Sequence, residues 1–146
     1  MSQANVELVR GLQPPPDVDI AQLIRDDALW RGVSGAMAPR YRSDFACAIP
    51  VFGTTKEFLG LDGLRAAWLD WLTPWVTYRT EVEDVIDFGD RVLVLVRDYG
   101  RHEYGGAEVE QADASIWTVC EGKIARAEFY PDRADALKAV APHNPN

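Results

Sequence analysis

The chain has 146 residues, a net charge of −8 and an isoelectric point near 4.7, which suits one domain that buries its own core. An acidic chain without a local basic patch repels phosphate backbones, so nucleic acid is excluded as the expected partner. No apolar stretch is long enough to span a bilayer and the N-terminus has no signal-peptide core, so we expect a cytoplasmic protein with no membrane partner.

The cysteines and histidines are too few and too scattered to indicate a metal centre. Cys47 and Cys120 are expected to be reduced, buried thiols, and neither of the two histidines belongs to a cluster with metal-ligand spacing. We therefore predict no metal and no cofactor. We also predict a single domain over residues 1–140 and a flexible C-terminal tail over 141–146.

The N-terminal segment has two helical patterns separated by prolines. Apolar residues at helical spacing predict a short helix over 5–12. Three successive prolines within 13–19 prevent its continuation, because proline lacks the backbone donor. A second helix is expected from about 20 to 30, capped by Asp17 or Asp19.

The middle of the chain combines one strand, one loop and one helix. Residues 44–52 have a strand composition, and 52–60 are expected to be a loop. Asp62 is expected to cap the helix that follows, which Thr73 and Pro74 close. One face of this helix is apolar and mostly aromatic: Leu64, Trp68, Trp71, Leu72 and Trp75.

The C-terminal half changes to the period of two that is typical of strands. Gly89-Asp90 is expected to be a hairpin turn, and Asp132 is expected to cap a final short helix over 131–140. The four predicted strands cover 77–88, 91–100, 109–119 and 123–130. This order of elements predicts an α+β fold with helices on one face of an antiparallel sheet.

The last predicted strand shows which of its faces meets the helices. Ala125, Ala127 and Phe129 share the apolar face, which we expect to lie toward the helices. The two preceding strands carry apolar residues on both faces, so alternation alone does not decide their orientation.

Two segments, "EVEDVIDFGDRVLVLVRDYGRHEYGG" and "ASIWTVCEGKIARAEFYPDRADAL", resemble the SnoaL-like branch of the nuclear transport factor 2-like superfamily. The resemblance extends from about Asn5 to Val140. It implies a strongly bent antiparallel sheet wrapped around the N-terminal helices, with a cone-shaped apolar pocket between them. It also implies a homodimer formed through the outer face of the sheet.

The resemblance implies an orientation for the ambiguous strands. The residues expected to point into the pocket are Leu93, Leu95, Arg97, Tyr99, Asp113, Ser115, Trp117, Ala127 and Phe129. An isolated guanidinium there would be costly, so Arg97 is expected to pair with Asp113. The expected outer row, and hence the dimer face, is Val92, Val94, Val96 and Ile116.

The catalytic groups of three kinds of superfamily member match this chain unequally. Members similar to ketosteroid isomerase need an oxyanion Asp where this chain has Ser115. Members similar to limonene-epoxide hydrolase have an Arg that matches Arg97, but Tyr99 and Phe129 replace its two Asp partners. Members similar to the polyketide cyclase SnoaL use an Asp and a His, which correspond to Asp113 and His102.

The candidate catalytic residues are therefore Asp113 as acid and base, Arg97 and Tyr99 as oxyanion donors, and His102 as helper. The alternatives are a structural Arg97–Asp113 pair and a solvated His102. The candidate ligand-binding residues, which are equally compatible with an ordinary core, are Trp30, Trp68, Trp71, Ser115, Trp117 and Phe129. The predicted function is a proton-transfer isomerase or cyclase acting on a small apolar or aromatic ligand, or alternatively a non-catalytic ligand-binding or dimerisation module.

Overall fold

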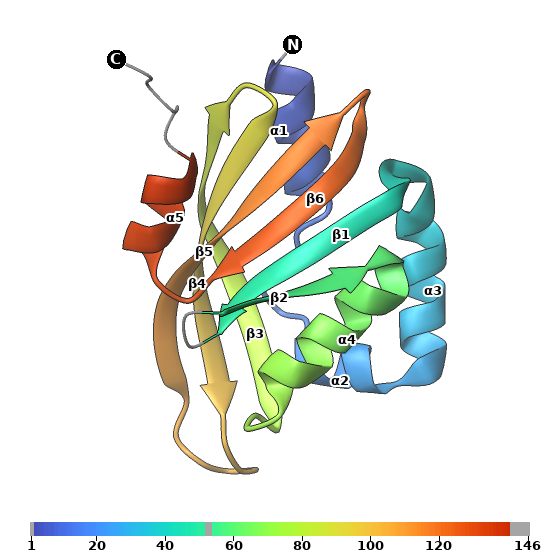
Figure 1. Cartoon of the computed structure of the whole chain (residues 1–146). Helices are drawn as coiled ribbons and strands as arrows, with labels where there is room; N and C mark the ends of the chain where they lie inside the picture. Colours follow the sequence, from blue (N-terminus) through green and yellow to red (C-terminus); the bar gives the residue numbers. More distant parts are fainter. Residues whose placement is uncertain (1, 52–53, 141–146) are drawn as a thin grey trace.

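The computed structural model describes residues 2–51 and 54–140, so the predicted tail over 141–146 lies outside the described residues. Figure 1 shows the sheet between α3 and α4 on one side and α5 on the other. The elements are α1 (Ser2–Gly11), α2 (Ile20–Arg25), α3 (Asp27–Met37), a 3-10 turn (Ala38–Arg40), β1 (Tyr41–Val51), β2 (Thr54–Leu59), α4 (Gly60–Leu72), β3 (Thr77–Phe88), β4 (Arg91–Arg101), β5 (Val109–Cys120), β6 (Lys123–Tyr130) and α5 (Arg133–Val140).

The described strands form one curved sheet in the order β2-β1-β6-β5-β4-β3. Neighbouring strands are antiparallel, except that β1 runs parallel to β6. The sheet does not close, and the N-terminal helices pack against it (Figure 1). The predicted α+β class with a bent sheet around N-terminal helices is confirmed.

Aspartate side chains set where the N-terminal helices begin. Asp19 accepts a hydrogen bond from the amide of Ala21, as the predicted cap should, and another from the amide of Tyr78 in β3, both 3.1 Å long. The same carboxylate thus starts α2 and ties it to the sheet. The single helix predicted over 20–30 is wrong, because Asp26 ends α2 and caps α3 by accepting from two amides.

Two predictions for the middle of the chain are also wrong. Residues 54–59, expected to be loop, form strand β2, which pairs with the outer edge of β1. Helix α4 starts at Gly60, so Asp62 lies inside its first turn and is not its cap. A carboxylate there still interacts favourably with the positive end of the helix dipole.

The hairpin and the four C-terminal strands agree with the sequence pattern. Phe88 pairs with Arg91 across the two-residue turn, where Gly89 has a φ of 86° that glycine adopts without steric cost. Asp132 accepts a 2.8 Å hydrogen bond from the amide of Ala134, as expected for the cap of the last helix. A β-bulge at Glu83 shifts the register of β3 against β4.

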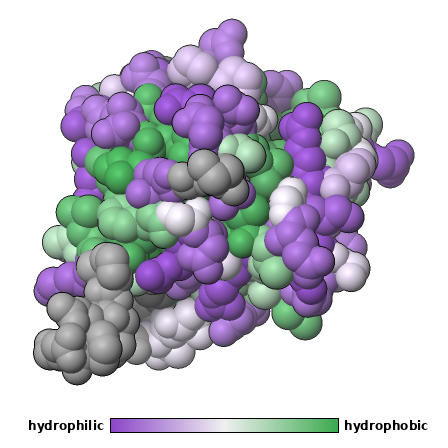
Figure 2. Space-filling view, turned by 90° about the horizontal axis from the view of Figure 1, so that it is seen from above, coloured by the Kyte–Doolittle hydropathy of each residue, from purple (hydrophilic) through white to green (hydrophobic). Residues whose placement is uncertain are grey.

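The apolar side chains form two clusters on opposite faces of the sheet. The larger lies between the sheet and α1–α4. The smaller joins Leu93 and Ile116 on the outer face to Ala136 and Val140 of α5. Seen from above, hydrophobic side chains reach the surface between hydrophilic ones rather than being fully covered by them (Figure 2).

Gly100 packs directly beneath the indole of Trp75, and a Cβ atom at this position would overlap that ring. Trp75 is held by stacking on His102, with ring centroids 4.1 Å apart, and by contact with Tyr78. We expect Gly100→Ala to lower the free energy of unfolding by about 1–3 kcal/mol, as overpacking does. Urea denaturation measures this change.

Gly35→Ala is the matched control, because Gly35 lies in α3 with open space where its Cβ would be. This substitution should raise the unfolding free energy by about 0.5–1 kcal/mol, since alanine favours a helix. A neutral or stabilising Gly100→Ala would contradict the packing argument.

Candidate functional site

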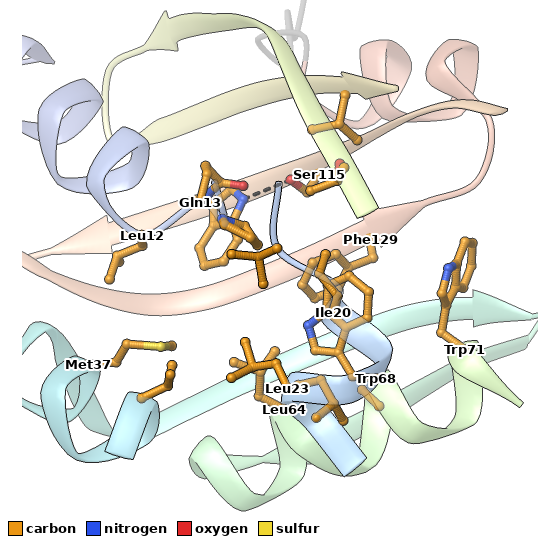
Figure 3. Close-up of a pocket in the computed structure, with 18 of the residues that line it drawn as sticks. Leu12, Gln13, Ile20, Leu23, Met37, Leu64, Trp68, Trp71, Ser115 and Phe129 are labelled. Carbon is orange, nitrogen blue, oxygen red and sulfur yellow. Dashed lines mark hydrogen bonds between the residues drawn. The ribbon is translucent and has the colours of Figure 1, made fainter. Parts of the chain in front are cut away.

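A pocket of about 430 Å³ lies between the sheet and the N-terminal helices. Its exposed lining residues are Gly11, Pro15, Ala36 and Arg40, which places its mouth between the proline segment and the end of α3. Figure 3 shows Leu12 and Met37 at one side of the pocket and Trp71 at the other. The volume falls within the usual range for small-molecule sites.

Aromatic and aliphatic side chains make most of the pocket wall. Phe129 meets Trp68 edge-on at 6.1 Å and Trp117 at 5.9 Å between ring centroids. Ser115 accepts a 2.8 Å hydrogen bond from the indole of Trp117. All six residues predicted to bind ligand line this pocket, from α3, α4, β5 and β6: Trp30, Trp68, Trp71, Ser115, Trp117 and Phe129.

Two aspartates lie at the polar end of the pocket. Asp98 in β4 and Asp113 in β5 both line it, and each is only 6% exposed. They share the inner face because Asp113 lies opposite Val96 in the sheet, and Val96 is two residues from Asp98. The Tyr78 hydroxyl donates a 2.5 Å hydrogen bond to Asp98 and accepts a 2.8 Å one from the indole of Trp71.

The environment of this pair favours one shared proton. Burial raises the pKa of Asp113 far above its usual value, and a hydrogen bond with Asp98 and the charge of Asp98 raise it further. Arg133 opposes the shift without cancelling it. Burial also raises the pKa of Tyr78, with the charge of Asp98 adding to the effect, so its phenol stays protonated. Such a pair can give a proton to a ligand atom and take one back.

Three buried polar atoms along this pocket lack a hydrogen-bond partner within the described part of the chain. They are the Tyr41 hydroxyl, the Thr80 Oγ1 and the Asp113 Oδ1. Buried polar atoms are nearly always paired in folded proteins. Their position along one cavity indicates that a ligand or ordered solvent completes these hydrogen bonds.

The predicted inward orientation of Arg97 and Tyr99 is wrong. Arg97 lies on the outer face, where it bonds to Glu83 at 3.1 Å and Glu110 at 2.6 Å instead of Asp113. Tyr99 also lies outside the pocket, with its ring 4.0 Å from the guanidinium of Arg79. The partner of Asp113 is therefore the carboxyl group of Asp98.

The same reversal affects the remaining predictions for β4. Leu93 and Leu95 do not line the pocket, whereas Val92 and Val94 are completely buried on the inner side, so these valines cannot form the predicted dimer face. Helix α5 covers part of the true outer row, including Ile116.

His102 lies away from the pocket, beside the segment that joins α4 to β3. Its ring stacks on Trp75, and its Nδ1 is 2.9 Å from the carbonyl oxygen of Pro74. Of the four predicted catalytic residues, only Asp113 lines the pocket.

Arg97→Gln tests whether Arg97 lies on the outer face, as in the structure, or in the pocket, as the resemblance implied. Because Arg97 points away from the pocket and its ion pairs lie at the surface, we expect this variant to keep the affinity of the wild type for apolar ligands within about twofold. Quenching of tryptophan fluorescence by 2-acetylnaphthalene measures the affinity. A tenfold or larger loss of affinity would show that Arg97 takes part in ligand binding.

Sequence reasoning missed Asp98, Tyr78, Thr80 and Tyr41. One sequence signal was available for Asp98, because it continues the alternating row of valines along one face of β4. In the structure, the carboxylates of Glu81, Glu83 and Glu110 surround Arg97 on the outer face.

The described residues show neither a metal-ligand cluster nor a membrane-spanning helix. Among residues 2–51 and 54–140, no group of three or more His, Cys, Asp or Glu side chains is arranged to hold a metal ion. Within the same ranges, no helix combines the length and the hydropathy needed to cross a bilayer.

Known proteins share this architecture. A protein from Jannaschia sp. CCS1 described as a SnoaL-like polyketide cyclase has a TM-score of 0.65 at 19% identity, over 98% of this chain and 95% of its own. A nuclear transport factor 2-like protein of unknown function from Burkholderia pseudomallei K96243 has a TM-score of 0.62 at 17% identity, over 94% and 98%. TerC, crystallised with polyporic acid, has a TM-score of 0.61 at 20% identity, over 94% and 98%.

These identities support the fold alone, and no curated protein matches the sequence. The family is shown by a different comparison, in which the model of the SnoaL-like domain matches residues 19–127. That segment runs from the Asp19 cap to Ala127 of β6 and includes both pocket aspartates. The chain therefore belongs to the SnoaL-like domain family.

Proposed function

We propose that this protein binds a flat, apolar or aromatic carbonyl compound in the pocket and catalyses proton transfer on it, as an isomerase or cyclase does. The observation that carries the proposal is the buried Asp98–Asp113 pair at the end of an aromatic pocket. Two carboxyl groups in such an environment hold one proton between them and can act as acid and base together.

In the proposed step, Asp113 gives its proton to the carbonyl oxygen of the ligand. The charged carboxylate of Asp98 takes a proton from the carbon next to the carbonyl, which leaves an enol and a pair that still holds one proton. Reversal of these transfers at another carbon completes an isomerisation. Tyr78, held by Trp71, donates to Asp98 and orients its carboxylate.

The apolar wall supports this chemistry for a physical reason. Burial of Asp113 keeps the cost of charging its carboxyl group high, so its pKa is raised and the acid stays protonated near neutral pH. The aromatic residues provide broad surfaces on which a planar ligand can stack. The similarity to a protein crystallised with polyporic acid also favours a small molecule as occupant.

The test uses 2-acetylnaphthalene, which has a planar ring, a ketone and exchangeable methyl protons. Binding is measured by quenching of tryptophan fluorescence, and enol formation by loss of the methyl proton signal in deuterated water. We expect saturable exchange that 2-methylnaphthalene, which has no carbonyl, inhibits by competition. Binding without exchange above the buffer rate would reject the catalytic role and favour the non-catalytic ligand-binding module.

The homodimer remains a separate prediction. Helix α5 covers part of the outer sheet face, so a partner would contact the apolar residues left beside it, Ile86, Phe88, Leu95 and Tyr130, which are only partly buried. Light scattering after size-exclusion chromatography tests this prediction, and a monomer at all concentrations would reject it.

A further inference from the structure

We propose that Tyr41 is a second polar anchor for the ligand and that the ligand therefore carries a hydrogen-bonding oxygen or nitrogen at each end. The inference rests on the proposed ligand-binding function of the pocket and specifies the class of molecule that fills it. The juxtaposition that carries it is a phenol and a carboxyl oxygen along one apolar cavity, neither of which has a hydrogen-bond partner among the described residues.

Tyr41 is held in a defined position although its hydroxyl has no partner among the described residues. It is 5% exposed, and its ring packs edge-on against Phe45 with centroids 4.7 Å apart. The aromatic packing fixes the ring, so the hydroxyl remains buried beside the cavity it lines. A phenol that served only the core would lose nothing by being phenylalanine.

The sheet register places Tyr41 far from the carboxyl pair. Tyr41 begins β1, and its ring packs on Phe45, two residues before Cys47. Cys47 lies opposite Ala127 of β6, which lies opposite Trp117 of β5. Asp113 is four residues from Trp117 along β5, about 13 Å at the usual strand rise. A ligand that reaches both groups must therefore be elongated.

The chemistry of Tyr41 limits what its end of the ligand can be. Burial raises the pKa of this phenol, and the Cys47 thiol raises it further, so the hydroxyl is neutral. A neutral hydroxyl donates one hydrogen bond and accepts another. It suits a ketone, hydroxyl or ether, whereas it offers no positive charge to balance a carboxylate. The ligand class is therefore an elongated planar molecule with a carbonyl at the Asp98–Asp113 end and a hydrogen-bonding polar group at the Tyr41 end.

The experiment compares two probes that differ only at the far end, 2-acetylnaphthalene and 2-acetyl-6-hydroxynaphthalene. Dissociation constants are measured by fluorescence quenching for the wild type, Tyr41→Phe and the control Tyr104→Phe, whose tyrosine is 82% exposed. We expect the hydroxylated probe to bind the wild type on the order of fivefold more tightly, as one hydrogen bond allows. Tyr41→Phe should abolish this preference, and Tyr104→Phe should keep it.

A thermal melt of the ligand-free proteins separates recognition from structure. If the phenol exists for a ligand, Tyr41→Phe removes an unpaired buried group and its melting temperature should equal or exceed that of the wild type. An unfolded or clearly destabilised Tyr41→Phe protein would show a structural role and overturn the proposal. Equal preference in Tyr41→Phe and wild type, or no preference in the wild type, would overturn it as well.

Failure of the Tyr41 anchor can be distinguished from failure of the proposed catalysis. Deuterium exchange of the acetyl group is measured on the wild type alone, whereas the role of Tyr41 is read from the ratio of two affinities. A retained preference without exchange would reject only the proton transfer. Exchange without a preference would reject only the second anchor.

Discussion

Asp113→Asn is expected to slow deuterium exchange of bound 2-acetylnaphthalene by about 100-fold or more, the usual contribution of a general acid or base. The amide has nearly the shape of the protonated carboxyl group and can still donate a hydrogen bond to Asp98. It cannot release a proton to the ligand. The exchange rate at saturating ketone, followed by proton magnetic resonance, measures the change.

The affinity for the ketone should change much less than the rate, because the aromatic wall that binds its rings is untouched. Asp70→Asn is the matched control, since Asp70 lies on α4 with its side chain 55% exposed and paired with Lys56. This variant should exchange as fast as the wild type. An Asp113→Asn protein that retains full exchange would remove Asp113 from the mechanism.

The same substitution is expected to stabilise the folded protein near neutral pH. The folded pKa of Asp113 is raised above its unfolded value near 3.8. Its contribution to stability is therefore complete below pH 3.8 and is lost as the pH rises toward the folded pKa. Asparagine has no such dependence, so we expect Asp113→Asn to be more stable than the wild type by about 2 kcal/mol or more at pH 7.

Urea denaturation at pH 5, 6, 7 and 8 tests this dependence. The difference in unfolding free energy between Asp113→Asn and wild type should increase by as much as ~1.4 kcal/mol per pH unit, because one group is being titrated. Titrating groups that do not interact with Asp113 are common to both proteins and cancel in the difference. A difference that stays constant over this range, or falls, would contradict a buried, protonated Asp113.

One cavity is lined by a carboxyl group that costs stability, Asp113, and by two hydroxyl groups that have no hydrogen-bond partner in the described part of the chain, those of Tyr41 and Thr80. Natural proteins retain such costs where a functional site needs them. The stabilities of Asp113→Asn and Tyr41→Phe therefore test, at the two ends of the pocket, whether these groups are retained for function at a cost in stability.

How much of the site was predictable differs between the helices and the strands. The aromatic wall was predictable because Trp68 and Trp71 share one face of α4, and a helical face follows directly from spacing. Asp113, Ser115 and Trp117 were placed inward correctly from the resemblance. Arg97 and Tyr99 were placed wrongly, and Asp98 was missed, because one reversed strand exchanges every residue of its two faces.

The orientation of β4 could not be read from its residues, since valines occupy one face and leucines the other. The seven-residue connection over 102–108 leaves the register of β4 against β5 open, and the bulge at Glu83 shifts its register against β3. Strand β2 was missed because its side chains are mostly exposed and carry no apolar alternation. Only pairing with β1 makes it a strand.

The sequence by itself determined the α+β class, the hairpin at Gly89-Asp90 and the aromatic face of α4, because these depend on turn chemistry and on the spacing of nearby residues. Only the tertiary structure decided that Asp98, and not Arg97, meets Asp113. That choice depends on strand register and on a second apolar layer under α5, which are contacts between residues far apart in the chain.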